Sequence, residues 1–246
     1  MTKFHDREPI LELSEVSKCF GKAEALNGIS FDINLGEVVG LIGPNGAGKT
    51  TLIKCLAGLV KPTSGQIAKR ECIDLQSRGA IRDLAFVYEV DALPLDMTVR
   101  KFLLAEAYAI GQSWKRVDGT LNKFIPSQNK NRRIGELSMG NKRKVALAAA
   151  LLVDCNILVL DEPTNGLDFD GINTVRDIIR AQKCKGGSVV FSSHTISEVE
   201  KIADRIIVMS EGSIIFCGEG KMLQEEMGGR SLEEAYGFAI CSHRGS

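Results

Sequence analysis

Residues 43–50 read GPNGAGKT and lie between an apolar run at residues 37–43 and a segment with helical spacing at residues 50–59. Glycines allow backbone conformations that are closed to other residues, so successive N–H groups of this stretch can converge on phosphate oxygens. The pattern G-x-x-x-x-G-K-[ST] between a strand and a helix is that of a phosphate-binding loop. The stretch therefore predicts a nucleoside triphosphate site at the end of a buried strand.

Each part of this loop has an expected contact with the nucleoside triphosphate. The helix that begins near Lys49 directs its positive end at the phosphates, and the Lys49 ammonium can reach the β- and γ-phosphates. The Thr50 hydroxyl can bind Mg²⁺, and Thr51 can contact the α-phosphate. The expected ATP-binding residues here are Gly43, Pro44, Asn45, Gly46, Ala47, Gly48, Lys49, Thr50 and Thr51.

A second buried strand is predicted at residues 155–163, CNILVLDEP, with two carboxylates at its end. In phosphate-loop NTPases an Asp in this position helps to hold Mg²⁺, so Asp161 is an expected metal ligand. Glu162 is placed to polarise a water for attack on the γ-phosphate. The alternative is that the two acids cap a helix.

His194 follows a third apolar run, GSVVFSS at residues 187–193. A histidine at the end of a strand beside the Glu162 strand can donate a hydrogen bond to the γ-phosphate. The expected catalytic residues are therefore Glu162, His194 and Lys49, while a structural role remains the alternative for His194.

Predicted strands alternate with predicted helices along the chain. Alternating apolar and polar residues at 10–20 predict an edge strand, and residues 29–37 predict another strand with a turn. Residues 195–205 predict a short amphipathic helix, and residues 205–219 predict a hairpin with Glu-Gly near its turn. This order predicts an α/β fold with a mostly parallel sheet and antiparallel edge strands.

Between residues 91 and 153 the pattern of apolar residues changes from one typical of strands to one typical of helices. β-branched runs are absent there, and residues 98–110 and 142–153 have helical apolar spacing. We expect an inserted helical lobe at residues 91–153. The ATP-binding core then comprises residues 8–90 and 154–227, and residues 228–246 form a C-terminal tail.

Composition excludes several classes of protein. Lys+Arg and Asp+Glu are both 31, so the net charge is zero and no nucleic-acid partner is expected. The seven cysteines lack the spacing of a zinc or redox motif, which predicts reduced and mostly buried thiols. No stretch approaches the roughly 20 apolar residues of a membrane span, and the first residues are too polar for a signal peptide.

Several motifs occur in an order that narrows the class further. They are GPNGAGKT (43–50), LSMGN (137–141), ILVLDEP (157–163), GLD (166–168) and SSH (192–194). The set resembles the ATP-binding subunits of ABC transporters, and the resemblance covers about residues 10–225. It implies an ATPase of the phosphate-loop NTPase fold that uses ATP and Mg²⁺.

In the family this chain resembles, two such domains meet head to tail around two ATP molecules. The resemblance implies that Ser138 and Gly140 face the γ-phosphate bound by a second ATP-binding subunit, identical or related. It implies that Asp168 couples the two sites and that Phe20 stacks on adenine. The alternative for Ser138 is an ordinary helix cap. The alternative for Asp168 is an acidic residue in a turn, and that for Phe20 is an aromatic side chain in the core.

The chain departs from the family pattern at three positions. The signature segment is commonly LSGGQ, and Met139 and Asn141 replace its third and fifth residues. Glu89 stands where the family usually has Gln, and its carboxylate can face Mg²⁺ or the attacking water. Glu89 is therefore the third expected metal ligand, beside Thr50 and Asp161; a solvated surface acid is the alternative.

A chain of this family without a membrane span implies a separate integral membrane permease, with the protein held at the cytoplasmic face of the cell membrane. The helical lobe is the expected docking region, and Leu93, Leu95 and Met97 are candidate contacts unless they pack internally. The tail SLEEAYGFAI at residues 231–240 resembles exporter subunits, which favours export. The alternative function is a soluble ABC-type ATPase in an assembly pathway, such as iron–sulfur cluster assembly.

Overall fold

A computed structural model describes residues 9–69, 82–87 and 90–244. The described strands are β1 (Pro9–Phe20), β2 (Ala23–Asn34), β3 (Val38–Ile42), β4 (Ser64–Lys69), β5 (Arg82–Phe86), β6 (Cys155–Leu160), β7 (Ser188–Ser193), β8 (Arg205–Ser210) and β9 (Ser213–Gly218). The helices are α1 (Lys49–Leu56), α2 (Val99–Ala109), α3 (Trp114–Phe124), α4 (Met139–Ala150), α5 (Phe169–Cys184), α6 (Ile196–Glu200), α7 (Gly220–Glu226) and α8 (Leu232–Arg244). Three short 3-10 helices are η1 (Val90–Ala92), η2 (Ser127–Asn129) and η3 (Ile134–Glu136).

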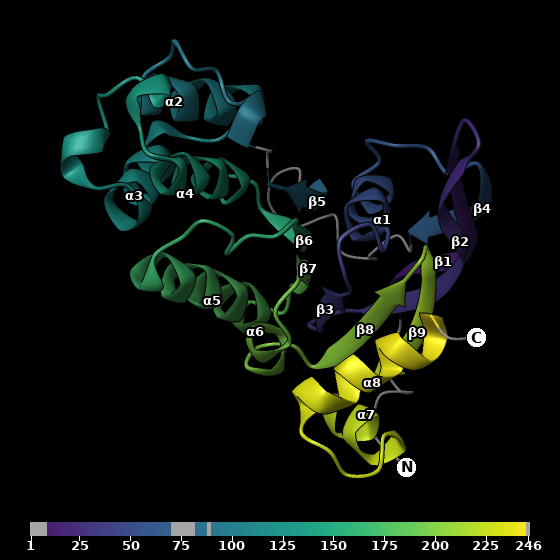
Figure 1. The fold of residues 1–246 in the computed structure, drawn as a ribbon. Helices are drawn as coiled ribbons and strands as arrows, with labels where there is room; N and C mark the ends of the chain where they lie inside the picture. The colour runs from purple at the N-terminus through teal and green to yellow at the C-terminus, as the bar shows by residue number, and fades with distance from the viewer. Residues whose placement is uncertain (1–8, 70–81, 88–89, 245–246) are drawn as a thin grey trace.

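The larger sheet has the order β5-β6-β7-β3-β8-β9 (Figure 1). Its first five strands run parallel, and β9 pairs antiparallel with β8 at one edge. Along β6, Leu158 and Leu160 enter one core, whereas Ile157 and Val159 enter the other. Burial on both faces explains the continuous apolar runs of these strands. The predicted α/β fold with a mostly parallel sheet is confirmed.

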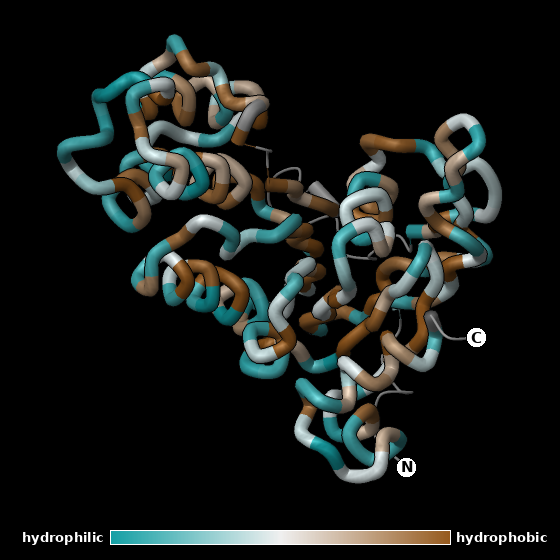
Figure 2. The backbone as a smooth tube through the Cα atoms, in the orientation of Figure 1, coloured by the Kyte–Doolittle hydropathy of each residue, from teal (hydrophilic) through white to brown (hydrophobic). Residues whose placement is uncertain are grey.

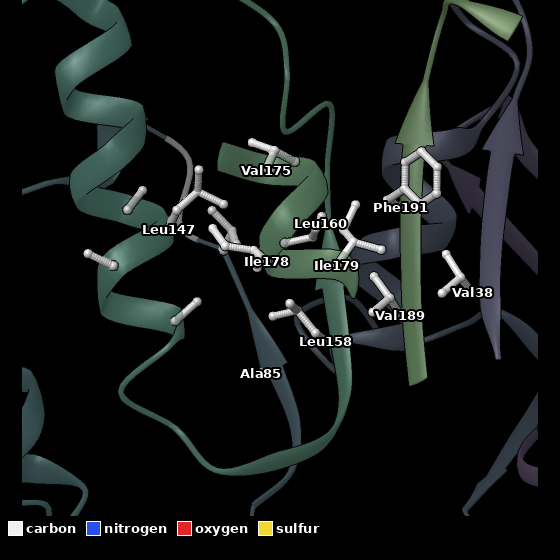
Figure 3. Packing of buried hydrophobic residues seen from close by; sticks show 14 of the residues in the cluster. Val38, Ala85, Leu147, Leu158, Leu160, Val175, Ile178, Ile179, Val189 and Phe191 are labelled. Carbon is white, nitrogen blue, oxygen red and sulfur yellow. The ribbon is translucent and has the colours of Figure 1, made fainter. Parts of the chain in front are cut away.

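Helix α5 covers one face of the large sheet, and α1 together with the small sheet covers the other. On one face, Val175, Ile178 and Ile179 of α5 pack against residues of β6 and β7 such as Leu158 and Val189 (Figure 3). On the other face, the second core combines residues of α1 with those of β1 and β2. Figure 2 shows the hydrophobic segments concentrated in the strands between these layers. Helices α2, α3 and α4 gather on the side away from the small sheet (Figure 1).

The edge position predicted for residues 10–20 is wrong. β1 is the middle strand of an antiparallel sheet with the order β2-β1-β4. Its second neighbour is β4, where Ile67 pairs with Leu13. β4 is short and mostly exposed, so its polar sequence carries no alternation that would reveal a strand.

Several predicted elements have the expected type with shifted ends. The helix predicted at 50–59 is α1, and the hairpin predicted at 205–219 is β8–β9. Glu211 (φ 50°) and Gly212 (φ 79°) form its two-residue turn, where positive φ matches the strand twist. Helices α3, α5, α7 and α8 were not individually predicted from the sequence.

The six described cysteines are free thiols, but the prediction that most are buried is wrong. Cys55 is buried, whereas Cys184, Cys217 and Cys241 are exposed, because they lie at a helix end, on an edge strand and on the last helix. Cys72 lies outside the described residues. No helix in the described part of the chain is both long and apolar enough to cross a membrane.

Candidate functional site

The loop at residues 43–48 joins β3 to α1, and close approaches explain its glycines. A Cβ on Gly43 would lie 2.3 Å from the Met209 carbonyl oxygen. A Cβ on Gly48 would lie 2.5 Å from the Ala25 carbonyl oxygen, and Gly48 also has a φ of 97°. A side chain at either position would therefore displace neighbouring backbone.

This loop forms one wall of an open cleft of about 710 Å³. The cleft is lined by Ala25, Asn45, Gly46, Ala47, Gly48, Lys49, Thr50, Thr51, Glu162, Asn165 and His194. It brings most of the predicted site residues together. In the described part of the chain, Phe20, Gly43, Pro44 and Asp161 are not among its lining residues.

Lys49, the first residue of α1, is 6% exposed and folds back over the loop. Its Nζ donates to the carbonyl oxygens of Gly43 at 2.7 Å and Pro44 at 3.3 Å. Burial lowers the pKa of Lys49, while the charges of Glu162 and Asp161 oppose that shift. The ammonium is thus fixed at the loop, where phosphate oxygens would meet it.

The Glu162 carboxylate lies between the Lys49 ammonium and the His194 imidazole of the cleft. Its Oε1 is 3.8 Å from Lys49 Nζ, and its Oε2 is 2.9 Å from His194 Nδ1. Glu162 has a φ of 44°, in the left-handed region that few side-chain-bearing residues adopt. The end of β6, the end of β7 and the start of α1 therefore meet at one carboxylate.

Ser192, at the end of β7, connects the two acidic residues. Its hydroxyl donates to Asp161 Oδ1 at 2.7 Å and accepts from the Glu162 N–H at 2.8 Å. This serine belongs to the SSH motif, which by itself indicates no role for it. Ala25 and Asn165, which line the cleft, carry no pattern that would have identified them. Glu89 lies outside the described residues.

The residues expected to face a second subunit lie at the starts of α4 and α5. Ser138 caps α4 and accepts from the Asn141 side-chain amide at 2.9 Å. Asp168 caps α5 by accepting from the Gly171 N–H at 2.8 Å. A Cβ on Gly140 would lie 3.4 Å from the Gly166 carbonyl oxygen, so the start of α4 lies beside the segment that leads into α5.

Phe20 is 53% exposed at the end of β1, which excludes the alternative of a core aromatic. The Lys18 ammonium lies 5.0 Å from its ring centroid. Among the candidate docking residues, Leu93 is buried at 4% exposure, Leu95 is 49% exposed and Met97 packs against the core. The prediction of a surface contact is therefore wrong for Leu93, because its side chain fills the core.

A second hollow of about 320 Å³ lies between α3, the end of α4 and α5. It is lined by Arg116, Gly119, Thr120, Lys123, Phe124, Leu151, Ile178, Ala181, Gln182 and Lys185. Arg116 forms two hydrogen bonds of 2.7 Å with the Asp154 carboxylate, and these lower the pKa of Asp154. Lys123 and Lys185 are exposed, so the groove combines apolar residues such as Phe124 and Ile178 with basic ones.

The strand–loop–helix around GPNGAGKT, with an acidic pair at the end of a nearby parallel strand, defines a phosphate-loop NTPase. The ABC transporter family profile matches residues 26–165. The Nod factor export ATP-binding protein I of Burkholderia orbicola (strain AU 1054) is 37% identical over 232 residues, which are 92% of this chain and 76% of that protein. The lantibiotic transport ATP-binding protein SrtF of Streptococcus pyogenes is 36% identical over 233 residues, 94% of this chain and 97% of that protein.

The comparison with solved structures agrees with these sequence matches. A structure of an ATP-binding subunit of an ABC transporter has a TM-score of 0.82 and 29% identity, and the match covers 94% of this chain and 99% of that chain. The chain belongs to the ABC transporter family and is an ATP-binding ATPase of that family. The predicted family and the predicted enzyme class are confirmed.

Proposed function

We propose that this protein dimerises around ATP, hydrolyses it and thereby drives a separate membrane permease in export. The observation that carries the proposal is the Glu162 carboxylate, which lies 3.8 Å from Lys49 Nζ and 2.9 Å from His194 Nδ1 at the phosphate-loop cleft. These distances support the assignment of Glu162 as a base, Lys49 as a fixed cation and His194 as a hydrogen-bonding imidazole beside the γ-phosphate.

In the proposed reaction, ATP and water become ADP and phosphate. Glu162 accepts the proton of a water that attacks the γ-phosphate, because a carboxylate within reach makes the water a better nucleophile. Lys49 and His194 stabilise the negative charge on the phosphoryl oxygens. The backbone N–H groups of the loop and the start of α1 hold the remaining phosphates.

The donor groups fit Mg²⁺ bound together with ATP. Among the described residues, no group of three or more His, Cys, Asp or Glu could hold a metal by itself. Mg²⁺ usually takes one or two carboxylates together with substrate phosphates and water, rather than an all-protein cage. Thr50 and Asp161 would supply the protein ligands, with Glu89 as a further candidate, and bound Mg²⁺ would neutralise charge on the phosphates.

The proposed dimer uses the helix starts described above. Ser138 and Gly140, at the start of α4, would face the γ-phosphate bound by a second ATP-binding subunit, which can be identical or related. Asp168 would lie at the contact between the two subunits. These residues are absent from the cleft lining within the described residues, which suits a contact with another chain.

The proposed permease contact is the groove between α3, α4 and α5. Its apolar residues Phe124 and Ile178 suit a helical segment of a membrane protein, and Lys123 and Lys185 suit acidic groups on that segment. Residues 91–153 would then act as a lobe that transmits closure around ATP to the permease. Export is proposed because the two relatives above are named for export of Nod factor and transport of a lantibiotic.

One experiment tests the proposal. Tagged wild-type and Glu162→Gln chains would be purified with ATP and Mg²⁺ from detergent-solubilised source membranes, and co-purifying proteins would be identified by mass spectrometry. We expect a polytopic membrane protein with both. We expect Glu162→Gln to lower turnover by about 100-fold or more while it keeps ATP and accumulates as a dimer.

The matched control is Glu226→Gln, which removes an exposed carboxylate of α7 and is expected to behave as wild type. Full turnover in Glu162→Gln would remove Glu162 from the reaction. Only soluble partners, from a preparation in which membrane proteins are well recovered, would favour an assembly ATPase instead.

A further inference from the structure

A single arginine of α4 contacts the backbone of both acidic residues of the site. An amino group of the Arg143 guanidinium donates to the Asp161 carbonyl oxygen at 3.2 Å and also to the Glu162 carbonyl oxygen. These are contacts within one chain, from α4, whose first turn includes part of the signature segment, to the two residues just after β6. None of the site residues predicted from the sequence has this role.

The contact is made at Glu162, whose backbone has an unfavourable conformation. Glu162 has a φ of 44°, a conformation that costs energy in a residue with a side chain and persists only when its surroundings hold it. The Ser192 hydroxyl accepts from the Glu162 N–H at 2.8 Å on one side. Arg143 holds the carbonyl on the other side, so the two peptide groups that flank the Glu162 side chain are both fixed.

α4 also contacts the segment that follows Glu162. Lys144 Nζ lies 3.9 Å from Asp168 Oδ1, and Gly140 approaches the Gly166 carbonyl oxygen. The first turns of α4, which Ser138 caps, and residues 161–168 are therefore joined at several points. A displacement of the start of α4 would be transmitted to the backbone of Glu162 through Arg143.

We propose that Arg143 is a positioning residue, which orients the Glu162 carboxylate and couples it to the start of α4 in the same chain. The inference rests on the proposed function, because it takes Glu162 as the base that activates water. When a second subunit's nucleotide engages Ser138, Arg143 carries the resulting shift of α4 to the chain's own catalytic carboxylate.

The test compares Arg143→Ala, Arg143→Gln and Arg143→Lys in ATPase assays, with ATP affinity measured by calorimetry and folding by thermal melting. Loss of a group that positions a catalytic residue commonly lowers turnover by about 10- to 100-fold. We expect that fall in kcat for Arg143→Ala, with an unchanged dissociation constant for ATP. Lys and Gln each keep a donor, so they are expected to retain part of kcat.

The matched control is Arg180→Ala, which removes a 61% exposed arginine that pairs with Asp177 on its own helix, α5. In a Glu162→Gln background, Arg143→Ala is expected to lower turnover no further, because both changes act on one group. Unchanged kcat in Arg143→Ala would overturn the inference, as would an additive loss or a joint loss of ATP binding and thermal stability. If Glu162→Gln alone kept full turnover, the proposed role of Glu162 would fail instead.

Discussion

The Lys49 side chain is buried, and it carries a positive charge at the phosphate-loop cleft. It is 6% exposed, and its Nζ donates to the Gly43 carbonyl oxygen at 2.7 Å, so the ammonium is already oriented before nucleotide arrives. A prearranged cation loses little conformational freedom when a phosphate binds. A large share of nucleotide affinity should therefore depend on this one side chain.

We expect Lys49→Ala to weaken ATP binding by at least about 10-fold, since hydrogen bonds to charged groups contribute about 1.5–3 kcal/mol. The dissociation constant for ATP, measured by calorimetry, checks this. Lys115→Ala removes an exposed lysine of α3 and should leave the constant unchanged. Equal affinity in Lys49→Ala and wild type would show that Lys49 does not contact the phosphates.

The sequence predicted the site residues for which the expected chemistry requires a particular residue type. The loop glycines, Lys49, Asp161 and Glu162 occur in patterns that follow from the chemistry of phosphate binding and hydrolysis. Ser192 and Arg143 were not predicted because they contact the acidic pair only through tertiary structure. Arg143 in addition donates to backbone carbonyl oxygens, which every residue carries. Such roles become visible only when strands and helices are placed in space.

Helix α6 lies unusually close to β3, and Gly40 makes the approach possible. A Cβ on Gly40 would lie 2.3 Å from Val199 Cγ1 and 3.2 Å from the Cβ of Ala203. Val199 is fully buried and β-branched, so its methyl group cannot rotate away freely. The glycine in the middle of this central strand therefore reflects helix packing.

We expect Gly40→Ala to destabilise the protein by about 1–3 kcal/mol through overpacking. Chemical denaturation followed by circular dichroism measures the change. Adding Val199→Ala to Gly40→Ala should recover part of the loss, because it makes room for the new methyl group. Gly237→Ala, on α8 with nothing within 4 Å of the new Cβ, should instead stabilise by about 0.5–1 kcal/mol. Failure of Val199→Ala to compensate would mean that the clash lies elsewhere.

Elements buried on both faces were the easiest to predict from sequence. β3, β6 and β7 are short apolar runs without alternation, and each is a strand of the parallel sheet. β1 was given the wrong position because its outer neighbour, β4, is mostly exposed and has a polar sequence. Pairing order depends on the partner strand, and the sequence of β1 alone does not reveal how many partners it has.

At the scale of the whole molecule, Arg205 connects the large sheet to the small sheet and to the turn before β3. Arg205, at the start of β8 in the large sheet, lies 2.8 Å from Glu37 and 3.1 Å from Asp32 of β2 in the small sheet. The Glu37 side chain is 1% exposed, and its Oε2 also accepts from the Asn34 N–H at 3.0 Å. The cluster thus links β8, β2 and the turn that leads into β3.

Removal of the cation alone would leave the Glu37 charge buried without its partner. We therefore expect Arg205→Met to destabilise the protein by about 3–5 kcal/mol. The double variant Arg205→Met/Glu37→Gln should lose less, because no buried charge remains to be stabilised. Guanidinium denaturation of the single and double variants measures both, with Arg180→Ala as an exposed control expected within about 0.5 kcal/mol of wild type. A double variant less stable than Arg205→Met would contradict this account, since the buried charge could then not be the main source of the loss.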